Sequence, residues 1–300
     1  MKSTLEEQQA FIAVVDSGSI TAAAERLEMT VSGVSRALNR LEQKLATTLL
    51  RRTTRRLELT DEGETFLAHC RRILAAVEIA EEAIVGHHDQ PQGRLRVNAA
   101  PSFMQFVIVP IIGEFRARYP GITLELDTHD RFIDLLEQRV DLAIRIGELN
   151  DSSLHARPLG HSPLRLLASP GYLERHGVPR RVEDLADHSL LGFSQLDHLN
   201  DWPLLDAQGQ PFHVKPSLSA SSGPTLLELV TAGEGIACLA DYMTLRPRQL
   251  GTLIDILPEQ TQFQTQRINV VYYRQTALSR RARLLMDFLA QRLPGDYLSI

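Results

Sequence analysis

Residues 19–45 read SITAAAERLEMTVSGVSRALNRLEQKL, and this stretch decides the fold of the N-terminal part of the chain. Ser19 and Thr30 each precede a segment with helical spacing, where a hydroxyl can cap the first turn. The second segment has an apolar inward stripe, which consists of Val34, Leu38, Leu41 and Leu45. Two short helices joined by a tight turn, the second polar on its outer face, suit the DNA major groove, which admits a single helix. The stretch therefore predicts a helix-turn-helix.

The outer face of that second helix supplies the candidate DNA contacts, which are Thr30, Val31, Ser32, Ser35, Arg36, Asn39 and Arg40. Residues 49–60, LLRRTTRRLELT, predict a short β-ribbon with Leu57 and Leu59 turned inward. Its tip carries the remaining candidates, Arg51, Arg52, Arg55 and Arg56, which suit phosphate or minor-groove contact. A basic island in a chain of formal net charge −5 indicates a local polyanion contact. A solvated helix face explains the charge alone equally well.

One further helix is expected on each side of this region. Residues 4–7, TLEE, form a capping box for the first, and Gly18 can end it in the left-handed conformation. The other begins at Thr60, and its apolar residues recur in alternating steps of four and three, at Phe66, Cys70, Ile73, Val77, Ala80 and Ile84. This narrow seam is typical of a two-helix coiled coil and predicts dimerisation. The alternative is an amphipathic helix packed on its own domain.

From Arg94 onward the pattern alternates between strands and helices. Strands are expected at 95–99, 123–126, 142–146, 165–168, 190–193, 218–220, 236–239 and 268–272, and an amphipathic helix at 278–293. The alternation predicts α/β architecture with a mostly parallel sheet. It falls into two similar sets, which indicates two lobes with a ligand crevice between them.

The candidate effector contacts lie at the predicted strand-to-helix turns. Ala100, Pro101 and Ser102 form one turn, and Ser221 and Ser222 belong to another. Hydroxyls and free amides at a helix N-terminus attract anions, although plain helix capping explains either turn taken alone. Arg145 could also pair with an anion, or with Glu148 or Asp151 as a structural partner. Phe193, Ser194 and Trp202 complete the candidates.

Several of these motifs occur together in the order that is typical of one family. FIAVV at 11–15, AAAERL at 22–27, VSR at 34–36, LRRT at 50–53 and LTDEG at 59–63 resemble the DNA-binding signature of LysR-type transcriptional regulators. RIGEL at 145–149 and ASPGYL at 168–173 resemble the CrgA/YafC-like subgroup, and the likeness covers nearly the whole chain. The resemblance implies a winged helix-turn-helix, a linker helix that pairs subunits, and a two-lobed effector domain like the periplasmic binding proteins.

The resemblance has one departure within the recognition helix. Many family members carry a base-reading glutamine where this chain has Val31, and valine can make only apolar contact, for instance with a thymine methyl group. The operator preference of relatives therefore does not transfer at this position.

These observations predict a multidomain regulator with five segments. They are a DNA-binding domain at 1–60, a dimerisation helix at 61–86, a hinge at 87–93, a first effector lobe at 94–162 with 268–300, and a second lobe at 163–267. The expected partners are double-stranded DNA, a small anionic effector and a second copy of the chain, with tetramers or larger assemblies implied by the family. The alternatives are an architectural DNA-binding protein without a ligand and, more remotely, an α/β-domain enzyme.

Composition and motifs exclude other classes. No phosphate-binding glycine loop, G-x-S-x-G elbow or H-E-x-x-H motif is present, so an enzyme is not expected. Cys70 and Cys238 lack metal-ligand spacing, and neither a metal nor a cofactor is predicted. The chain shows no signal peptide and no apolar window long enough for a bilayer, which predicts a cytoplasmic protein without membrane contact.

Overall fold

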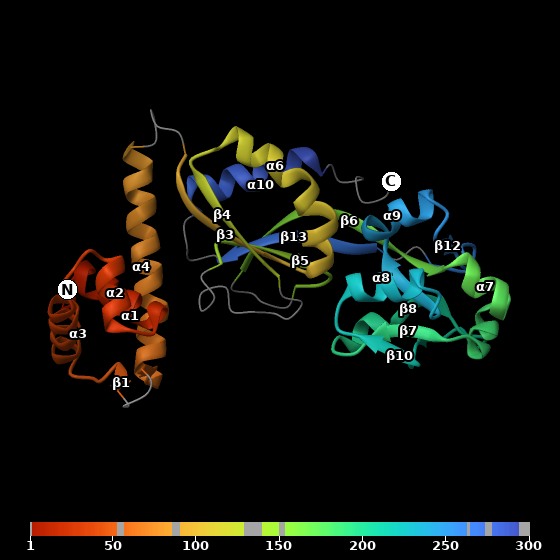
Figure 1. Cartoon of the computed structure of the whole chain (residues 1–300), viewed down its shortest axis with the longest axis horizontal. Coiled ribbons are helices and arrows are strands. Elements are labelled where there is room, and N and C mark those ends of the chain that lie inside the picture. Colours follow the sequence, from red (N-terminus) through yellow and green to blue (C-terminus); the bar gives the residue numbers. More distant parts are fainter. Residues whose placement is uncertain are drawn as a thin grey trace. The chain divides into compact units, whose positions relative to one another are not determined.

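The computed structural model describes residues 2–52, 57–85, 91–128, 140–149, 154–262, 265–273 and 278–293. The chain forms two compact units, one made mainly of residues 1–89 and the other mainly of the residues from 90 onward (Figure 1). Among the described residues, no helix has both the length and the apolar composition that crossing a membrane requires.

The first unit is a winged helix-turn-helix followed by a long helix. Its elements are α1 (Leu5–Ser17), α2 (Ile20–Arg26), α3 (Val31–Leu45), β1 (Leu50–Arg52), β2 (Leu57–Leu59) and α4 (Asp61–Val85). The strands β1 and β2 pair antiparallel and form the wing. The predicted caps are confirmed: Thr4 forms a capping box, while Ser19 and Thr30 accept hydrogen bonds from backbone amides of α2 and α3. Gly18 follows α1 with φ +63°.

The core of this unit joins all four helices. Phe11, Leu38 and Leu41 are fully or almost fully buried, and the Phe11 ring contacts Phe66 of α4 with centroids 5.7 Å apart. Buried alanines, Ala23 and Ala24, allow α2 to approach its neighbours closely. The C-terminal half of α4 extends past the body formed by α1–α3 (Figure 1). The seam predicted on α4 is therefore divided between a buried portion and an exposed one.

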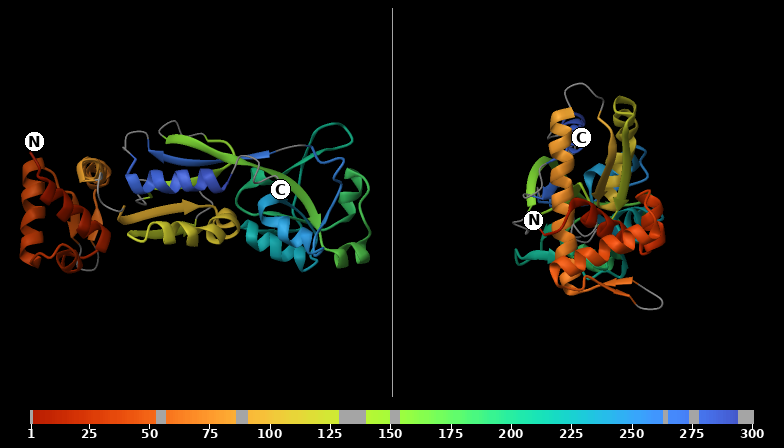
Figure 2. Two further views of the ribbon diagram at one scale, coloured as in Figure 1. Left: turned by 90° about the horizontal axis from the view of Figure 1, so that it is seen from above. Right: turned by 90° about the vertical axis from the view of Figure 1, so that its left-hand side faces the viewer.

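The second unit is built on one mixed sheet, with strand order β10-β7-β11-β6-β13-β5-β3-β4 and β12 paired to β6. Its first lobe contains β3 (Gly93–Ala99), α5 (Pro101–Phe103), a π-helix (Met104–Ile108), α6 (Val109–Arg118), β4 (Ile122–Thr128), β5 (Leu142–Ile146), β13 (Thr265–Tyr273) and α10 (Arg280–Arg292). The helices α6 and α10 lie side by side, and their Phe115 and Phe288 rings are 5.4 Å apart (Figures 1 and 2).

The second lobe holds the remaining elements. They are α7 (Pro170–His176), β7 (Leu190–Phe193), β8 (Asp201–Leu205), β9 (Pro211–His213), β10 (Leu218–Ala220), α8 (Gly223–Thr231), β11 (Ile236–Ala240), α9 (Asp241–Gln249) and β12 (Ile254–Asp255), with short 3-10 helices at Val182–Asp187 and Asp197–Asn200. The β8–β9 hairpin, α9 and β12 were not predicted. The strands expected at 142–146, 190–193 and 218–220 occur with those bounds.

The prediction of a mostly parallel sheet is wrong. The pairs β3–β4, β3–β5, β7–β10 and β7–β11 are parallel, but β6 pairs antiparallel with β11, β12 and β13, and β13 also pairs antiparallel with β5. The long strand β6 (Leu154–Ala168) runs from the first lobe into the second beside β13 (Figure 2). Because β13 returns toward the first lobe, it must run opposite to β6. The predicted lobe boundaries, after residues 162 and 267, fall inside these two strands.

Candidate DNA-binding and effector sites

The N-terminus of α3 presents polar and apolar side chains to solvent. Val31 is 47% exposed, and Ser32 beside it is also exposed. The hydroxyl of Thr30 accepts a hydrogen bond from the Gly33 amide at 3.1 Å, which fixes the first turn. Arg36 lies one turn further on and donates from Nε to the carbonyl oxygen of Ser32 at 3.2 Å, so its side chain remains at the exposed surface. These residues are available to a DNA groove.

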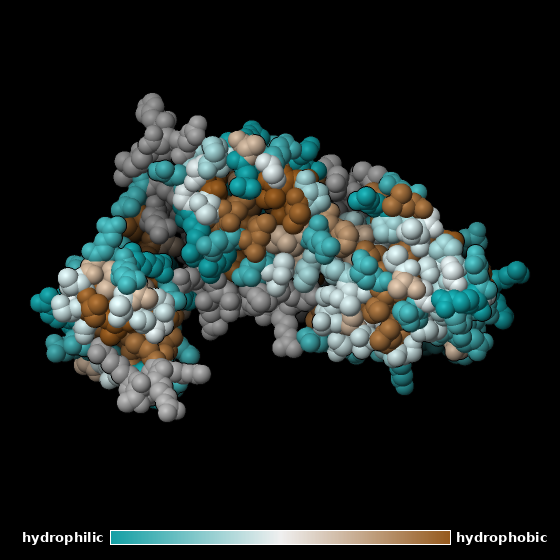
Figure 3. All heavy atoms as spheres, in the orientation of Figure 1, coloured by the Kyte–Doolittle hydropathy of each residue, from teal (hydrophilic) through white to brown (hydrophobic). Residues whose placement is uncertain are grey.

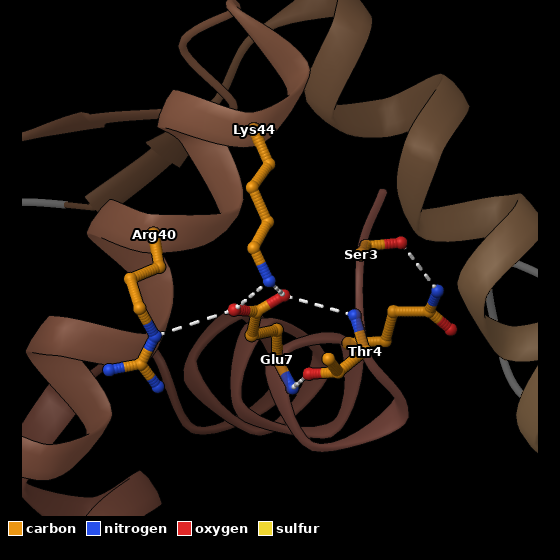
Figure 4. Close-up of polar contacts among 6 residues, drawn as sticks. Ser3, Thr4, Glu7, Arg40 and Lys44 are labelled. Atoms are coloured by element: carbon orange, nitrogen blue, oxygen red, sulfur yellow. Dashed lines mark hydrogen bonds and ion pairs between the residues drawn. The ribbon is translucent and has the colours of Figure 1, made fainter. Parts of the chain in front are cut away.

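The second half of α3 has a structural role that the sequence did not predict. Arg40 was expected to face DNA, but its Nε lies 3.4 Å from Oε1 of Glu7 on α1. Lys44 Nζ lies 2.7 and 2.9 Å from the two oxygens of the same carboxylate, which also accepts from the Thr4 amide at 3.0 Å (Figure 4). Arg40 is thus part of an ion-pair network that joins α1 to α3.

Burial alone would raise the pKa of Glu7, but the hydrogen bonds from Lys44, Thr4 and Arg40 outweigh this and hold that pKa below its ordinary value. Glu7 is therefore a buried anion at neutral pH that fixes the orientation of α3 on α1. The capping box gave the only sequence signal for it, because its cationic partners lie more than thirty residues away.

A second carboxylate positions the wing. Glu42 on α3 accepts hydrogen bonds from the backbone amides of Leu49 at 2.7 Å and Leu50 at 3.1 Å. Arg51 on β1 is exposed. Arg52 lies on β1 with only its backbone described, and Arg55 and Arg56 lie outside the described residues. Ser35 is half-buried, whereas Asn39 is exposed.

The structure divides the predicted seam of α4. The prediction is wrong for Cys70, because its side chain is fully buried in the core of its own unit, where burial raises the pKa of the thiol to about 12. Phe66 is partly buried against the same core. Ile73 is 38% exposed, Ala80 is exposed and Val77 is half-buried. The side chain of Ile84 lies outside the described residues, as does most of the predicted hinge.

The two predicted effector turns contact each other. Ser102 lies within α5 and is not a cap, and its hydroxyl is 2.8 Å from the Tyr242 hydroxyl of α9. A Cβ atom added at Gly223, the first residue of α8, would lie 3.5 Å from the Ser102 Cβ. Ser222 caps α8 by accepting from the Thr225 amide at 3.4 Å. Ala100 and Pro101 are half-buried, and Ser221 is exposed. Thus α5 of the first lobe meets α8 and α9 of the second at this point.

The remaining candidates differ in their relation to these turns, since Phe193 pairs with Ala220 of β10 and the Ser194 amide donates to the Ala220 carbonyl oxygen at 3.0 Å, directly before Ser221. Trp202 is buried in the core of the second lobe against Phe212 of the β8–β9 hairpin, so its assignment to an effector crevice is wrong. Phe193 is half-buried and donates its amide to Asn200 Oδ1 at 2.8 Å, while Ser194 is exposed. Arg145 is buried and its Nη1 donates to Asn98 Oδ1 at 2.6 Å. Glu148 is not among its partners.

Comparisons with known proteins cover both units. A family model described as "Bacterial regulatory helix-turn-helix protein, lysR family" matches residues 5–64, and one described as "LysR substrate binding domain" matches residues 88–294. The chain is 45% identical over 296 residues to the HTH-type transcriptional regulator CrgA of Neisseria meningitidis serogroup C, covering 99% of each protein.

Solved structures show the same likeness. CrgA, a LysR-type transcriptional regulator from Neisseria meningitidis, matches with a TM-score of 0.67 and 44% identity, covering 96% of this chain and 98% of that one. The full-length Vibrio cholerae virulence activator AphB matches with a TM-score of 0.61 and 29% identity, covering 96% and 99%. Because the matches cover both units and nearly the whole length, the chain belongs to the LysR family of DNA-binding transcriptional regulators.

Proposed function

We propose that this regulator binds a dyad-symmetric promoter site as a homodimer, with the N-terminus of α3 in the major groove and the wing along the phosphates. The exposed Val31, Ser32 and Arg36 on a capped helix end carry the proposal, since the first residues of a recognition helix reach the base edges. Arg51 on the wing supplies a phosphate contact. A promoter target also favours action in the cytoplasm.

Arg36→Ala is expected to weaken binding to the DNA upstream of the regulator's own gene by about 5- to 150-fold, the equivalent of ~1–3 kcal/mol for one base or phosphate contact. Arg36 pairs only with its own helix backbone among the described residues, so the fold should persist. Footprinting and electrophoretic mobility shifts at two salt concentrations measure the effect. Arg116→Ala, at an exposed position on α6, is the matched control and should bind normally. Unchanged footprints for the Arg36 variant would contradict its role.

The proposed dimer rests on the exposed apolar side of α4. Ile73 is 38% exposed and Ala80 is exposed in a single chain, and the C-terminal half of the helix extends past α1–α3 (Figure 1). Apolar side chains repeating at this spacing are buried when two such helices pair. Further assembly has support from apolar surface on the first lobe: Val109 of α6 is 54% exposed, and Figure 3 shows hydrophobic residues at the surface in the region of α6.

Ile73→Glu is expected to shift the protein from dimer to monomer at micromolar concentration, because pairing would bury a carboxylate in the seam. Sedimentation velocity measures the mass. Ile73→Leu keeps an apolar side chain and should remain dimeric. If the glutamate variant sediments like the leucine variant, α4 does not pair subunits through this side.

For the effector, we propose a small ligand at the contact of α5 with α8 and α9. The support is the convergence of Ser102, Tyr242 and Gly223 there. An anionic ligand that accepts from the Ser102 hydroxyl competes with the Tyr242 oxygen for the single Ser102 O–H donor, and this competition couples ligand binding to the contact between the lobes. The coupling requires that the ligand bind one arrangement better than the other.

A further inference from the structure

Arg145 on β5 is a buried cation that has no carboxylate among its hydrogen-bond partners in the described residues. The residue is 8% exposed. Nη1 donates to Asn98 Oδ1 at 2.6 Å and to the Ile144 carbonyl oxygen at 3.4 Å. Nη2 is shielded from solvent and has no hydrogen-bond partner in the part of the chain that the structure describes. Burial lowers the pKa of this guanidinium, yet arginine stays protonated in proteins.

The strand register shows what surrounds Arg145 on its face of the sheet. Asn269 of β13 is its direct partner, and Asn98 of β3 pairs with Ala143, two residues earlier on β5. Side chains two residues apart on a strand share a face, so Asn98, Arg145 and Asn269 lie together. Asn98 and Asn269 are also buried. The strand register therefore places two neutral amides beside the guanidinium at the end of β5.

This arrangement is costly for the unliganded protein. Moving a charged group out of water costs several kcal/mol, and a carboxylate usually compensates for the loss. Elsewhere in this unit the rule holds, since buried Asp241 pairs with Arg165 at 2.6 Å. Amide oxygens accept hydrogen bonds but carry no net charge, so they do not neutralise the guanidinium. Nη2 lacks even an amide oxygen as an acceptor within the described residues. A buried polar group left without a partner calls for an explanation.

We propose that Arg145 Nη2 binds the carboxylate of a small monoanionic ligand, with Asn98 holding the guanidinium in place. The proposal rests on the effector function above and names the chemical class of effector. A carboxylate suits the planar guanidinium, which offers two parallel N–H donors. The register also places Asp127 opposite Asn98 on this face, and an acidic neighbour disfavours a dianion such as phosphate.

Strand pairing connects the site to the contact between the lobes over a few residues. Ile144 pairs with Ala99, three residues before Ser102, whose hydroxyl bonds Tyr242 of the second lobe. Because Nη2 is shielded from solvent, an anion reaches it only after neighbouring groups move. The ligand thus binds the rearranged state better, which is the requirement for a ligand to shift a conformational equilibrium.

The test measures thermal unfolding of the full chain with 50 mM sodium acetate, benzoate or phosphate, in wild type and in Arg145→Met. Acetate or benzoate is expected to raise the wild-type midpoint by about 2–4 °C and to leave the methionine variant unmoved. Phosphate is expected to have the smaller effect. Without added anion, Arg145→Met should be as stable as wild type or more so, because the unpaired charge is gone. Equal shifts in both proteins, or none in wild type, would overturn the proposal.

Arg145→Lys covers the case in which the methionine variant does not fold. Lysine keeps the buried charge but lacks the two parallel N–H donors of a guanidinium. This variant should therefore need at least about tenfold more carboxylate for the same shift of the unfolding midpoint. An unchanged requirement would count against the site. Binding of each variant to the upstream DNA separates this proposal from the proposed function: Arg145→Met should still bind DNA. Carboxylate stabilisation that vanishes with Arg145 supports the site even if the ligand proves not to alter regulation.

Discussion

Gly63→Ala is expected to unfold the DNA-binding unit or to weaken it by about 3 kcal/mol or more. A Cβ atom at this position would lie 2.2 Å from the Leu49 carbonyl oxygen and 3.0 Å from Leu59 Cδ2. The oxygen cannot move aside easily, because it accepts from the Thr60 amide at 3.0 Å, while the Thr60 hydroxyl accepts from the Gly63 amide at 2.9 Å. Overpacking costs ~1–3 kcal/mol where side chains can yield, and here the obstacle is backbone.

Glycine is required at this position because another part of the backbone approaches it closely. It lies in the first turn of α4, and alanine would otherwise be favoured there by about 1 kcal/mol. The readouts are affinity for the upstream DNA and protease resistance of residues 1–85. Gly113→Ala is the matched control, because Gly113 is exposed in α6 with no atom within 4 Å of an added Cβ, so that variant should be as stable as wild type or slightly more stable. A fully active, protease-resistant Gly63 variant would contradict the steric argument.

Local features of the fold could be predicted because their causes lie within a few residues. Thr4, Ser19 and Thr30 cap helices as expected, since a cap depends only on a hydroxyl and the amide three residues later, and Ser222, a candidate effector contact, also fits the alternative of plain capping. Gly18 ends α1 for the same local reason.

Contacts between distant segments could not be predicted in this way. Lys44 meets Glu7 across two helices, and nothing near either residue indicates the pairing. Cys70 and Trp202 fit apolar patterns that do not distinguish a domain core from a seam or a binding surface. The helix α9 was missed because Pro247 lies inside it, where proline usually breaks a helix. The direction of β13 depends on its return beside β6, which spacing does not encode.

Asp241→Asn is expected to destabilise the effector unit by about 3–5 kcal/mol, the usual cost of removing one partner of a buried ion pair. Asp241 is fully buried at the start of α9. Its Oδ1 lies 2.6 Å from Arg165 Nε of β6 and also accepts from Arg248 Nη2. Arg248 reaches Asp255 as well, at 3.6 Å. Asparagine keeps the shape of the side chain but leaves two arginines without their shared carboxylate.

The burial of the ion pair, and not the distance between its charged atoms, should determine how much stability is lost. A second ion pair in the chain allows the comparison. Arg157 and Asp287 form an ion pair at the same distance of 2.6 Å, but the two side chains are 42% and 56% exposed. Asp287→Asn should therefore cost no more than ~1 kcal/mol, because water screens the pair and solvates the remaining charge. Urea unfolding followed by the fluorescence of Trp202, which is buried in the second lobe, compares the two variants.

Asp241→Asn should also weaken the contact between the lobes. Tyr242 follows Asp241 directly in α9, and its hydroxyl meets Ser102 of the first lobe at 2.8 Å. If Asp241 fixes α9 on β6, Asp241→Asn should loosen this contact and alter the response to carboxylates, while the separate DNA-binding unit keeps its intrinsic affinity for a non-specific duplex. Equal stabilities of the Asp241 and Asp287 variants would show that the buried carboxylate, with its two arginine partners, is not the anchor of α9.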